Sequence, residues 1–388
     1  MKEFLEFDVV VIGAGVCGIA TALSLAETGA KVAVLEKGEI CSGASSTNPG
    51  FCVLSYREDA YLMQLALDQQ KQWVEFAARI GCELEYKQKG GLIILNNQEE
   101  SAALEQLMEK CRSFGLKEIE MLNSKKTKLI EPYINEKAIV GSVYCQAEGM
   151  INPFKLNIAM ADYAKKLGVE FFLCTQVNGF EKNKQEITLI KTNRGNFKSS
   201  LVVLAAGAWT SPIIELLQEK IPVFFDKGEA MVSMQVDKLV YHSITDGGLF
   251  IPSNEKMVIG ACLGQTNSGN IVLAQATTKT NKYDTASTPT GMSKVAEKAV
   301  SLFPKLAEID ILRMWSGLIA YTQDRKPVFG FMNGINNLLI IAGFHSAIGI
   351  SPKIGALVAE YYMTGKLQQG VLGYSPKRFD VLKKNDST

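Results

Sequence analysis

The segment that most constrains this chain is a glycine-rich strand–helix–strand signature at residues 9–36. A continuous β-branched run at residues 9–12 predicts a short buried strand, and the glycine-rich turn 13–18 follows it directly. Residues 19–28 predict a helix, and residues 31–36 predict a second buried strand that ends on Glu36. Because strand, glycines, helix, strand and acid all fall at the expected spacing, the segment indicates a Rossmann-type dinucleotide site.

Each residue type in this signature has a physical role. Gly13 permits a tight turn out of the strand, Gly15 lets the backbone approach a pyrophosphate, and Gly18 lets the helix pack close to the sheet. The helix N-terminus offers free N–H groups and a partial positive charge to the pyrophosphate. Glu36 is placed to accept hydrogen bonds from a ribose 2′-hydroxyl, but the motif alone does not separate FAD from NAD. The predicted contacts here are Gly13, Ala14, Gly15, Val16, Cys17, Gly18, Glu36 and Lys37.

Charge and cysteine content narrow the class of protein. The 388 residues include 41 Lys and Arg against 40 Asp and Glu, and this balance argues against a nucleic-acid-binding protein. The eight cysteines contain no C-x-x-C pair, so they predict reduced thiols rather than a metal site or a disulfide framework. The N-terminus has acidic residues where a signal peptide would carry positive charge, and the longest apolar stretches, such as residues 338–343, are too short to span a membrane. We expect a cytoplasmic protein.

Hydrophobic periodicity predicts further elements along the chain. Between them, residues 264–291 are rich in Thr, Ser, Asn and Gly and predict a long surface excursion. Helices are predicted at 59–80, 98–114, 155–167, 292–303 and 353–363, and strands at 91–95, 169–174, 201–207, 221–236, 247–263 and 338–343.

Four features, taken in order, resemble a known flavoenzyme family. The first is the N-terminal signature followed by the loop Gly43-Ala44-Ser45…Asn48-Pro49-Gly50, and the second is Thr175-Gln176-Val177. The third is the turn at residues 202–210, and the fourth is the pair of runs at 315–330 and 341–352. Together they resemble the FAD-dependent D-amino-acid oxidase family, which includes glycine and sarcosine oxidases. The resemblance is greatest to the β subunits of proline, hydroxyproline and sarcosine dehydrogenases.

The resemblance implies an α/β fold in which two domains are interleaved along the chain. A Rossmann-type, three-layer FAD-binding domain of the glutathione-reductase type would take residues 1–85, 149–220 and 315–380. A substrate-binding domain on a large mixed sheet would take 86–148 and 221–314. A helix N-terminus at residues 349–352 would stabilise negative charge on a reduced flavin. The further cofactor contacts implied are Gly43, Ala44, Ser45, Asn48, Gly50, Val177, Ala206, Gly207, Trp209, Gly317, Gly343, Gly349, Ile350 and Ser351.

The implied reaction removes a hydride from the carbon next to an amine and delivers it to flavin N5, giving an imine. It needs positioning and a desolvated pocket rather than a strong base. The candidate catalytic residues are His345, Lys227 and Tyr321, and the candidate substrate-binding residues are Arg57, Phe250 and Trp209. The alternatives are a structural histidine for His345, a solvated strand-end charge for Lys227, and core packing for the aromatic residues.

Position 319 departs from the family pattern. Glycine-oxidase-like members carry an arginine there that grips the substrate carboxylate as a bidentate fork, whereas this chain has Ile319. A carboxylate anchor would then come from elsewhere, with Arg57 or Lys227 as candidates. The same position matches a cysteine that attaches flavin covalently in some members, so we expect non-covalent FAD.

Two other functions stay open at this point. One keeps the fold but oxidises a 2-hydroxy acid or a polyol phosphate, and the other is a catalytically silent FAD-binding subunit of a complex. The expected partners are a small amine or amino-acid substrate and an electron acceptor, which is oxygen, a quinone or a partner subunit in a hetero-oligomer. No nucleic-acid partner is expected.

Overall fold

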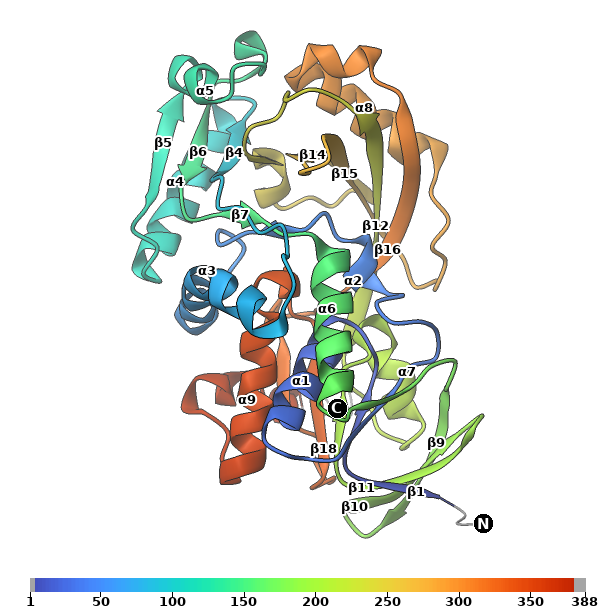
Figure 1. The fold of residues 1–388 in the computed structure, drawn as a ribbon. Helices are drawn as coiled ribbons and strands as arrows, with labels where there is room; N and C mark the ends of the chain where they lie inside the picture. Colours follow the sequence, from blue (N-terminus) through green and yellow to red (C-terminus); the bar gives the residue numbers. More distant parts are fainter. Residues whose placement is uncertain (1–3, 380–388) are drawn as a thin grey trace, which may run out of the picture.

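The computed structural model describes residues 4–379, which form two lobes, each built on one large sheet (Figure 1). In the first sheet the strand order is β17-β18-β11-β1-β2-β8, and β10 and β9 continue from β11. The strands from β18 to β8 are parallel, and β17 is antiparallel to β18. Its strands are β1 (Leu5–Ile12), β2 (Val32–Leu35), β8 (Glu170–Phe172), β9 (Val177–Asn183), β10 (Glu186–Thr192), β11 (Gly195–Leu204), β17 (Val328–Phe331) and β18 (Leu338–Ala342).

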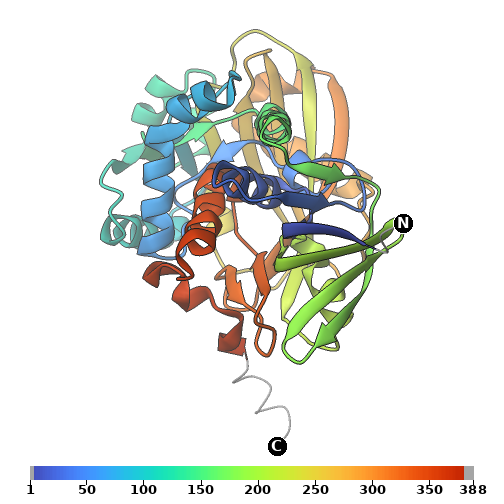
Figure 2. The ribbon, with the colours of Figure 1, turned by 60° about the horizontal axis from the view of Figure 1, so that its bottom comes forward.

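Helices cover one face of this parallel sheet. Helix α1 (Val16–Glu27) packs against α9 (Ser351–Thr364) and α6 (Pro153–Lys166), and Figure 2 shows α9 beside α1. Alternate residues of β1 serve opposite faces, since Val9 belongs to the core under these helices and Val10 to the core on the other face. Both side chains are fully buried, which stabilises the fold by about 1.5–3 kcal/mol each.

Helix boundaries follow local sequence signals. The Asp59 side chain caps the N-terminus of α3 (Ala60–Ile80) by accepting from Leu62 N, and Gly81, in the left-handed region at φ 67°, ends the helix. Asn152 caps α6 in the same way. The other α-helices are α2 (Ala44–Thr47), α4 (Glu99–Ser113), α5 (Ser124–Ile130), α7 (Thr210–Glu215) and α8 (Pro289–Leu302).

The second sheet is mixed, and its order is β16-β12-β15-β14-β13-β4-β6-β5. Its strand pairs are antiparallel except for β13 and β4, which run parallel. The predicted α/β class with a large mixed sheet is therefore confirmed. The strands are β4 (Gly91–Leu95), β5 (Ile119–Asn123), β6 (Gly141–Cys145), β12 (Val223–Gln235), β13 (Ser243–Asp246), β14 (Met257–Gln265), β15 (Asn270–Lys279) and β16 (Ile311–Thr322), and a separate two-stranded sheet pairs β3 (Phe51–Cys52) with β7 (Gly149–Met150).

The prediction of a surface excursion over residues 264–291 is wrong for most of its length. Residues 270–279 form β15, which lies inside the second sheet between β12 and β14. The run Ile271–Ala274 is buried and supplies the core, although the polar residues around it dominate the composition. Only residues 280–288 connect β15 to α8 without forming a helix or strand.

The division into interleaved domains stays a prediction. Every strand of the first sheet comes from residues 5–204 or 328–342, and the second sheet takes strands from 91–145 and 223–322. The proposed boundary at 315 falls inside β16, which belongs to the second sheet. Residues 1–3 and 380 of the predicted FAD-binding domain lie outside the described residues.

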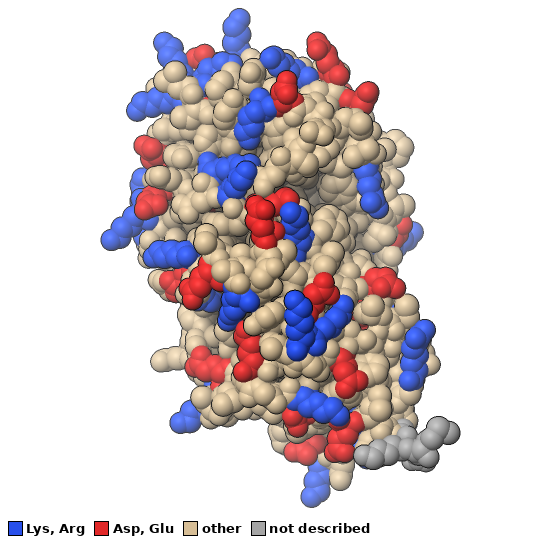
Figure 3. All heavy atoms as spheres, in the orientation of Figure 1, with Lys and Arg blue, Asp and Glu red and all other residues tan. Residues whose placement is uncertain are grey.

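The surface carries mixed charge. Figure 3 shows Lys and Arg interspersed with Asp and Glu over one face, in keeping with the net charge of +1. Within residues 4–379, no helix has the length and apolar character needed to cross a bilayer.

Candidate functional site

A cavity of about 1510 Å³ runs between the two sheets. Its walls come from the glycine-rich turn after β1, the loop at 42–49, the turn after β11, strands β12, β14, β15 and β16, and residues 341–348 at the end of β18 and after it. Both sheets therefore contribute to one site. The predicted residues that line it are Gly13, Gly15, Val16, Cys17, Glu36, Lys37, Gly43, Ala44, Ser45, Asn48, Val177, Ala206, Gly207, Trp209, Gly317, Gly343, Phe250 and His345.

One end of the cavity, here called the nucleotide end, is formed by the turn between β1 and α1. Gly13 has φ 110°, and a Cβ there would lie 2.5 Å from the Ala205 carbonyl oxygen. A Cβ on Gly18 would lie 2.0 Å from the Gly13 carbonyl oxygen, so helix and strand meet only because both residues lack side chains. A Cβ on Gly15 would meet only Ser45 Oγ, at 3.2 Å, which leaves this backbone open to the cavity.

Glu36 organises the nucleotide end. Its side chain is buried, and its carboxylate oxygens accept from Ala14 N and Gly38 N, each at 2.8 Å. The adjacent Lys37 places Nζ 3.4 Å from the centre of the Trp209 ring, and burial lowers the pKa of this lysine. These contacts fix the carboxylate at the end of β2, where the sequence predicts a ribose contact.

The loop at 43–50 is attached to both sheets. Ser45 Oγ accepts from Val16 N at 2.8 Å, and Thr47 O accepts from Trp315 Nε1 at 2.9 Å. A Cβ on Gly317 would lie 1.9 Å from Thr47 Oγ1, so β16 passes directly against this loop. Gly50 has a different role from the one predicted, because it packs against the Ile151 carbonyl and does not line the cavity.

The other end, here called the aromatic end, is formed by Tyr56, Phe250 and His345. The Tyr56 and Phe250 rings stack with centroids 4.9 Å apart, and His345 meets Tyr56 edge-on at 4.8 Å. The imidazole is accessible, but it opens onto the cavity, where surrounding protein displaces bulk water. Desolvation, helped by the guanidinium groups of Arg57 and Arg325, lowers the pKa of His345 to about 4.

Three predicted catalytic or substrate residues point away from the cavity. Arg57 is 2% exposed, and its guanidinium donates to the carbonyls of His345 (3.0 Å) and Ser346 (3.3 Å). Lys227 donates to Ala286 O at 2.8 Å, and the Tyr321 hydroxyl donates to Asp226 Oδ1 at 3.2 Å. The structure thus places Arg57 behind the His345 loop, Lys227 under the 280–288 connection, and Tyr321 beside a carboxylate that does line the cavity.

The remaining predicted cofactor contacts do not line the cavity but support the residues that do. Ala14 donates to Glu36, and Gly18 packs under the turn. Gly349, Ile350 and Ser351 are buried at the start of α9, directly after Ile348, which does line the cavity. Helix α9 begins with Pro352 in its first turn, as the sequence predicts, so its N-terminus is directed toward the end of the lining segment.

Comparison with known proteins identifies the family. Residues 8–361 match the family model described as FAD dependent oxidoreductase (DAO). The chain belongs to this family. It is 26% identical over 363 residues to a glycine oxidase of Geobacillus kaustophilus, with 92% of each chain covered. It is also 26% identical over 348 residues to the beta subunit of sarcosine oxidase from an Arthrobacter species, with 87% of this chain and 82% of that chain covered.

A solved structure agrees with this assignment. L-proline dehydrogenase from P. horikoshii superposes with a TM-score of 0.87 at 27% identity, covering 97% of this chain and 98% of that chain. The predictions of the family, of FAD as cofactor and of an oxidoreductase are therefore confirmed.

The cavity of this flavoenzyme fits FAD. Gly15, the N-cap of α1, lines the cavity and provides no side-chain cap, only Ser45 Oγ lies near its Cβ position, and both oxygens of Glu36 are held at the end of β2. These groups would hold the pyrophosphate and the adenosine ribose, while the rest of the cavity continues past Gly43 and Gly317 toward the aromatic end.

Several residues that line the cavity of this flavoenzyme were not predicted from the sequence. Tyr56 follows no recognisable motif, and Asp226 and Arg325 lie in segments whose predicted residues were Lys227 and Tyr321. Tyr283 also lines the cavity, and it stacks on Trp209 with centroids 5.6 Å apart. The alternation of side chains along β12 is a signal that could have found Asp226. Successive residues of a strand point to opposite faces, so Asp226 and Lys227 cannot both face the cavity.

Proposed function

We propose that this flavoenzyme oxidises the C–N bond of a small amino acid or secondary amine, of the proline, hydroxyproline, sarcosine or glycine type, to an imine. The observation that carries the proposal is the aromatic end, where Tyr56 stacks on Phe250 and meets the ring of His345 at the wall of the cavity. Relatives named as a glycine oxidase, the beta subunit of a sarcosine oxidase and an L-proline dehydrogenase support this choice of substrate class.

The residues of the aromatic end suit a neutral amine. Apolar rings disfavour an ammonium ion without a counter-charge, so they favour the deprotonated amine whose neighbouring carbon can release a hydride. Since the pKa of His345 is about 4, its imidazole is uncharged at pH 7, and its unprotonated ring nitrogen can accept a hydrogen bond. When bound, FAD supplies the hydride acceptor at N5.

Arg57 has a positioning role in this proposal. Its two hydrogen bonds hold the backbone carbonyls of His345 and Ser346, and Ser346 itself lies in the left-handed region at φ 50°. The guanidinium therefore fixes the loop that presents His345 to the cavity. Neither Arg57 nor Lys227 is proposed as the carboxylate anchor.

The FAD is proposed to be non-covalent, because Ile319 occupies the position of the attachment cysteine. Oxygen, a quinone or a partner subunit stay candidate electron acceptors. Some relatives are named as single subunits of a sarcosine oxidase or an opine oxidase, and they support a hetero-oligomer for this chain as well. A cytoplasmic location stays a prediction.

A visible spectrum and an anaerobic bleaching screen test the proposal. The protein is purified and its flavin spectrum recorded, and proline, hydroxyproline, sarcosine, glycine and D-amino acids are then added without oxygen, with 2-hydroxy acids and glycerol phosphate added in parallel. We expect a flavin spectrum that at least one of these compounds bleaches, and flavin that acid precipitation releases. Bleaching only by 2-hydroxy acids or glycerol phosphate, or by none of the compounds, would overturn the proposed substrate class.

A further inference from the structure

With Ile319 in place of the expected arginine, a carboxylate group needs another cation in the cavity. Among the described residues that line the cavity, Lys37, Lys279 and Arg325 carry positive charge. Lys37 lies over Trp209 at the nucleotide end. Lys279 Nζ reaches toward the Ser253 carbonyl at 3.5 Å. Arg325 is the remaining candidate.

Arg325 lies at the aromatic end of the cavity. Its guanidinium carbon is 4.3 Å from the centre of the Tyr321 ring, and it is close enough to His345 to lower the pKa of that imidazole. Within residues 4–379, its guanidinium N–H groups form no hydrogen bond or ion pair. Asp226, a carboxylate that lines the cavity, accepts from the Tyr321 hydroxyl, and the Arg325 charge only partly offsets the effect of burial, which raises the pKa of Asp226. The guanidinium donors are therefore available to a ligand.

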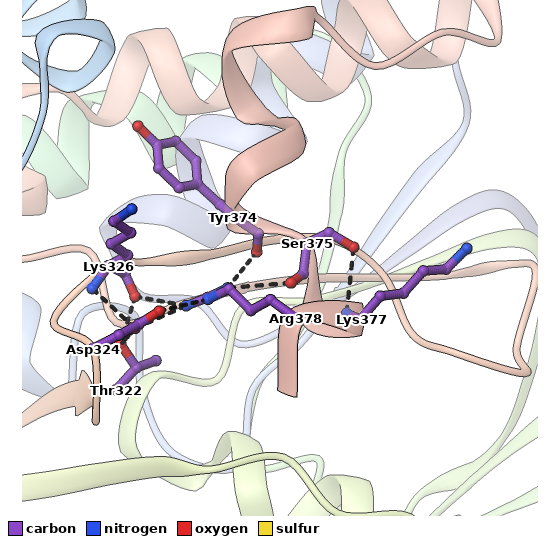
Figure 4. Close-up of polar contacts among 7 residues, drawn as sticks. All are labelled: Thr322, Asp324, Lys326, Tyr374, Ser375, Lys377 and Arg378. Carbon is purple, nitrogen blue, oxygen red and sulfur yellow. Dashed lines mark hydrogen bonds and ion pairs between the residues drawn. The ribbon is translucent and has the colours of Figure 1, made fainter. Parts of the chain in front are cut away.

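The backbone at Arg325 is strained, and a hydrogen-bond network maintains it. Arg325 has φ 59°, a conformation that L-residues rarely adopt. Figure 4 shows the network among residues on either side of it in the chain, in which Asp324 Oδ1 accepts from Thr322 Oγ1 at 2.8 Å and from Lys326 N at 3.2 Å. Together these bonds close the turn on both sides of Arg325.

Arg378 completes the network from the C-terminal part of the chain. It donates to Asp324 through Nε at 2.8 Å and through Nη2 at 3.2 Å, and also to the carbonyls of Lys326 and Tyr374 (Figure 4). The hydrogen bonds from Arg378 and Thr322 lower the pKa of Asp324 although burial opposes them. The carboxylate thus stays ionised at neutral pH and keeps the turn closed.

We propose that Arg325 binds the carboxylate of the substrate, taking over the role for which Ile319 is unsuited, and that Arg378 and Asp324 position it. The inference rests on the proposed function, because it assumes an amino-acid substrate at the aromatic end. A guanidinium with free donors presents the planar fork that matches a carboxylate. The closed turn reduces the backbone entropy lost on binding.

Carboxylate binding to the holoenzyme tests this proposal. The probes are pyrrole-2-carboxylate and its neutral isostere pyrrole-2-carboxamide, titrated by calorimetry and by the change in the flavin spectrum. The variants are Arg325→Gln, which removes the charge, and Arg325→Lys, which keeps the charge but loses the fork. Lys326→Gln is the matched control, because only its main chain takes part in the network and its side chain is exposed.

We expect Arg325→Gln to weaken pyrrole-2-carboxylate binding about 10- to 100-fold, with Arg325→Lys between it and wild type. Binding of the carboxamide, the FAD content and the Lys326→Gln protein should stay as in wild type. Equal carboxylate affinity in Arg325→Gln and wild type, or equal loss of the carboxamide, would overturn the anchor. So would failure of the wild-type protein to prefer the carboxylate.

A loss of FAD from Arg325→Gln without a loss of carboxylate affinity would assign the guanidinium to the cofactor and overturn the proposal. The outcome of the bleaching screen is independent of the outcome of these titrations. A protein that binds pyrrole-2-carboxylate through Arg325 but is bleached by no amine or amino acid would contradict the proposed function and leave the anchor in place.

Discussion

The two ends of the cavity recognise their ligands by different means. The nucleotide end uses main-chain groups at Gly13 and Gly15, which line the cavity, and Gly18 lets the helix pack close beneath them, all within one short stretch of sequence. The aromatic end uses the side chains of Tyr56, Phe250, Asp226, Arg325 and His345, which come from five separate segments. Backbone recognition depends on the absence of side chains, so few substitutions are tolerated. Side-chain recognition can change one residue at a time, and this is how a family with one cofactor can serve several substrates.

The largest effect is expected at the nucleotide end, from Gly18→Ala. The new Cβ would lie 2.0 Å from a main-chain oxygen that cannot move without displacing the turn, so we expect a loss of about 3 kcal/mol in stability. Gly15→Ala is the matched comparison, because its Cβ meets only Ser45 Oγ. It should keep the wild-type fold but weaken FAD binding about tenfold, or about 1.4 kcal/mol.

Thermal unfolding of the apoproteins and FAD titration separate these two outcomes. If Gly18→Ala unfolds at the wild-type temperature, or if Gly15→Ala binds FAD as tightly as wild type, then steric exclusion does not define this end of the cavity.

A smaller effect is expected at the aromatic end, from His345→Gln. Loss of the edge-on contact with Tyr56 should slow anaerobic flavin reduction by substrate about two- to tenfold. The folded-state pKa of about 4 lies below the ordinary value of 6.5, so the unfolded chain binds this proton more tightly than the folded protein. The free energy of unfolding therefore falls as pH falls from 6.5 toward 4. The variant should lose this part of the pH dependence of Tm.

His242→Gln serves as its control. His242 bonds Glu131 at 2.9 Å in the second lobe and does not line the cavity, so its replacement should leave the rate of flavin reduction unchanged. A comparable slowing in both variants would mean that the effect of His345→Gln is not local to the aromatic end.

The smallest effect is expected from Glu58→Gln, at the residue that follows Arg57 in the chain. Burial raises the pKa of Glu58 from 4.5 to about 7, against the opposing charge of Arg57. Since the folded state holds this proton more tightly than the unfolded state, stability falls as pH rises from 4.5 to 7. The variant should therefore gain on the order of 1 kcal/mol at pH 8, seen as a rise in Tm of about 1–2 °C, and nothing at pH 4.5. An equal gain at both pH values would contradict this origin.

The same comparison explains how far the sequence could predict the molecule. The βαβ unit and helix α3 follow mostly local rules, because Gly18, Asp59 and Gly81 each act on neighbours within a few residues. The wall behind the aromatic end follows from contacts such as that between Arg57 and His345, which lie 288 residues apart and leave no local pattern. Composition also led to the wrong prediction of a surface excursion, since the residues around Ile271–Ala274 are mostly polar although this run belongs to an interior strand.

The position of β18 has a consequence for biosynthesis. This strand pairs with β11 in the first sheet, and residues 341–348, at its end and after it, line the cavity. A nascent chain therefore lacks part of its flavin-binding wall until nearly all of it has left the ribosome, whereas every strand of the second sheet has been translated by residue 322. FAD can therefore bind in a complete site only late in synthesis. A chain that stops before β18 would lack part of the wall of the flavin site, and the edge of β11 that pairs with β18 would be exposed to proteases.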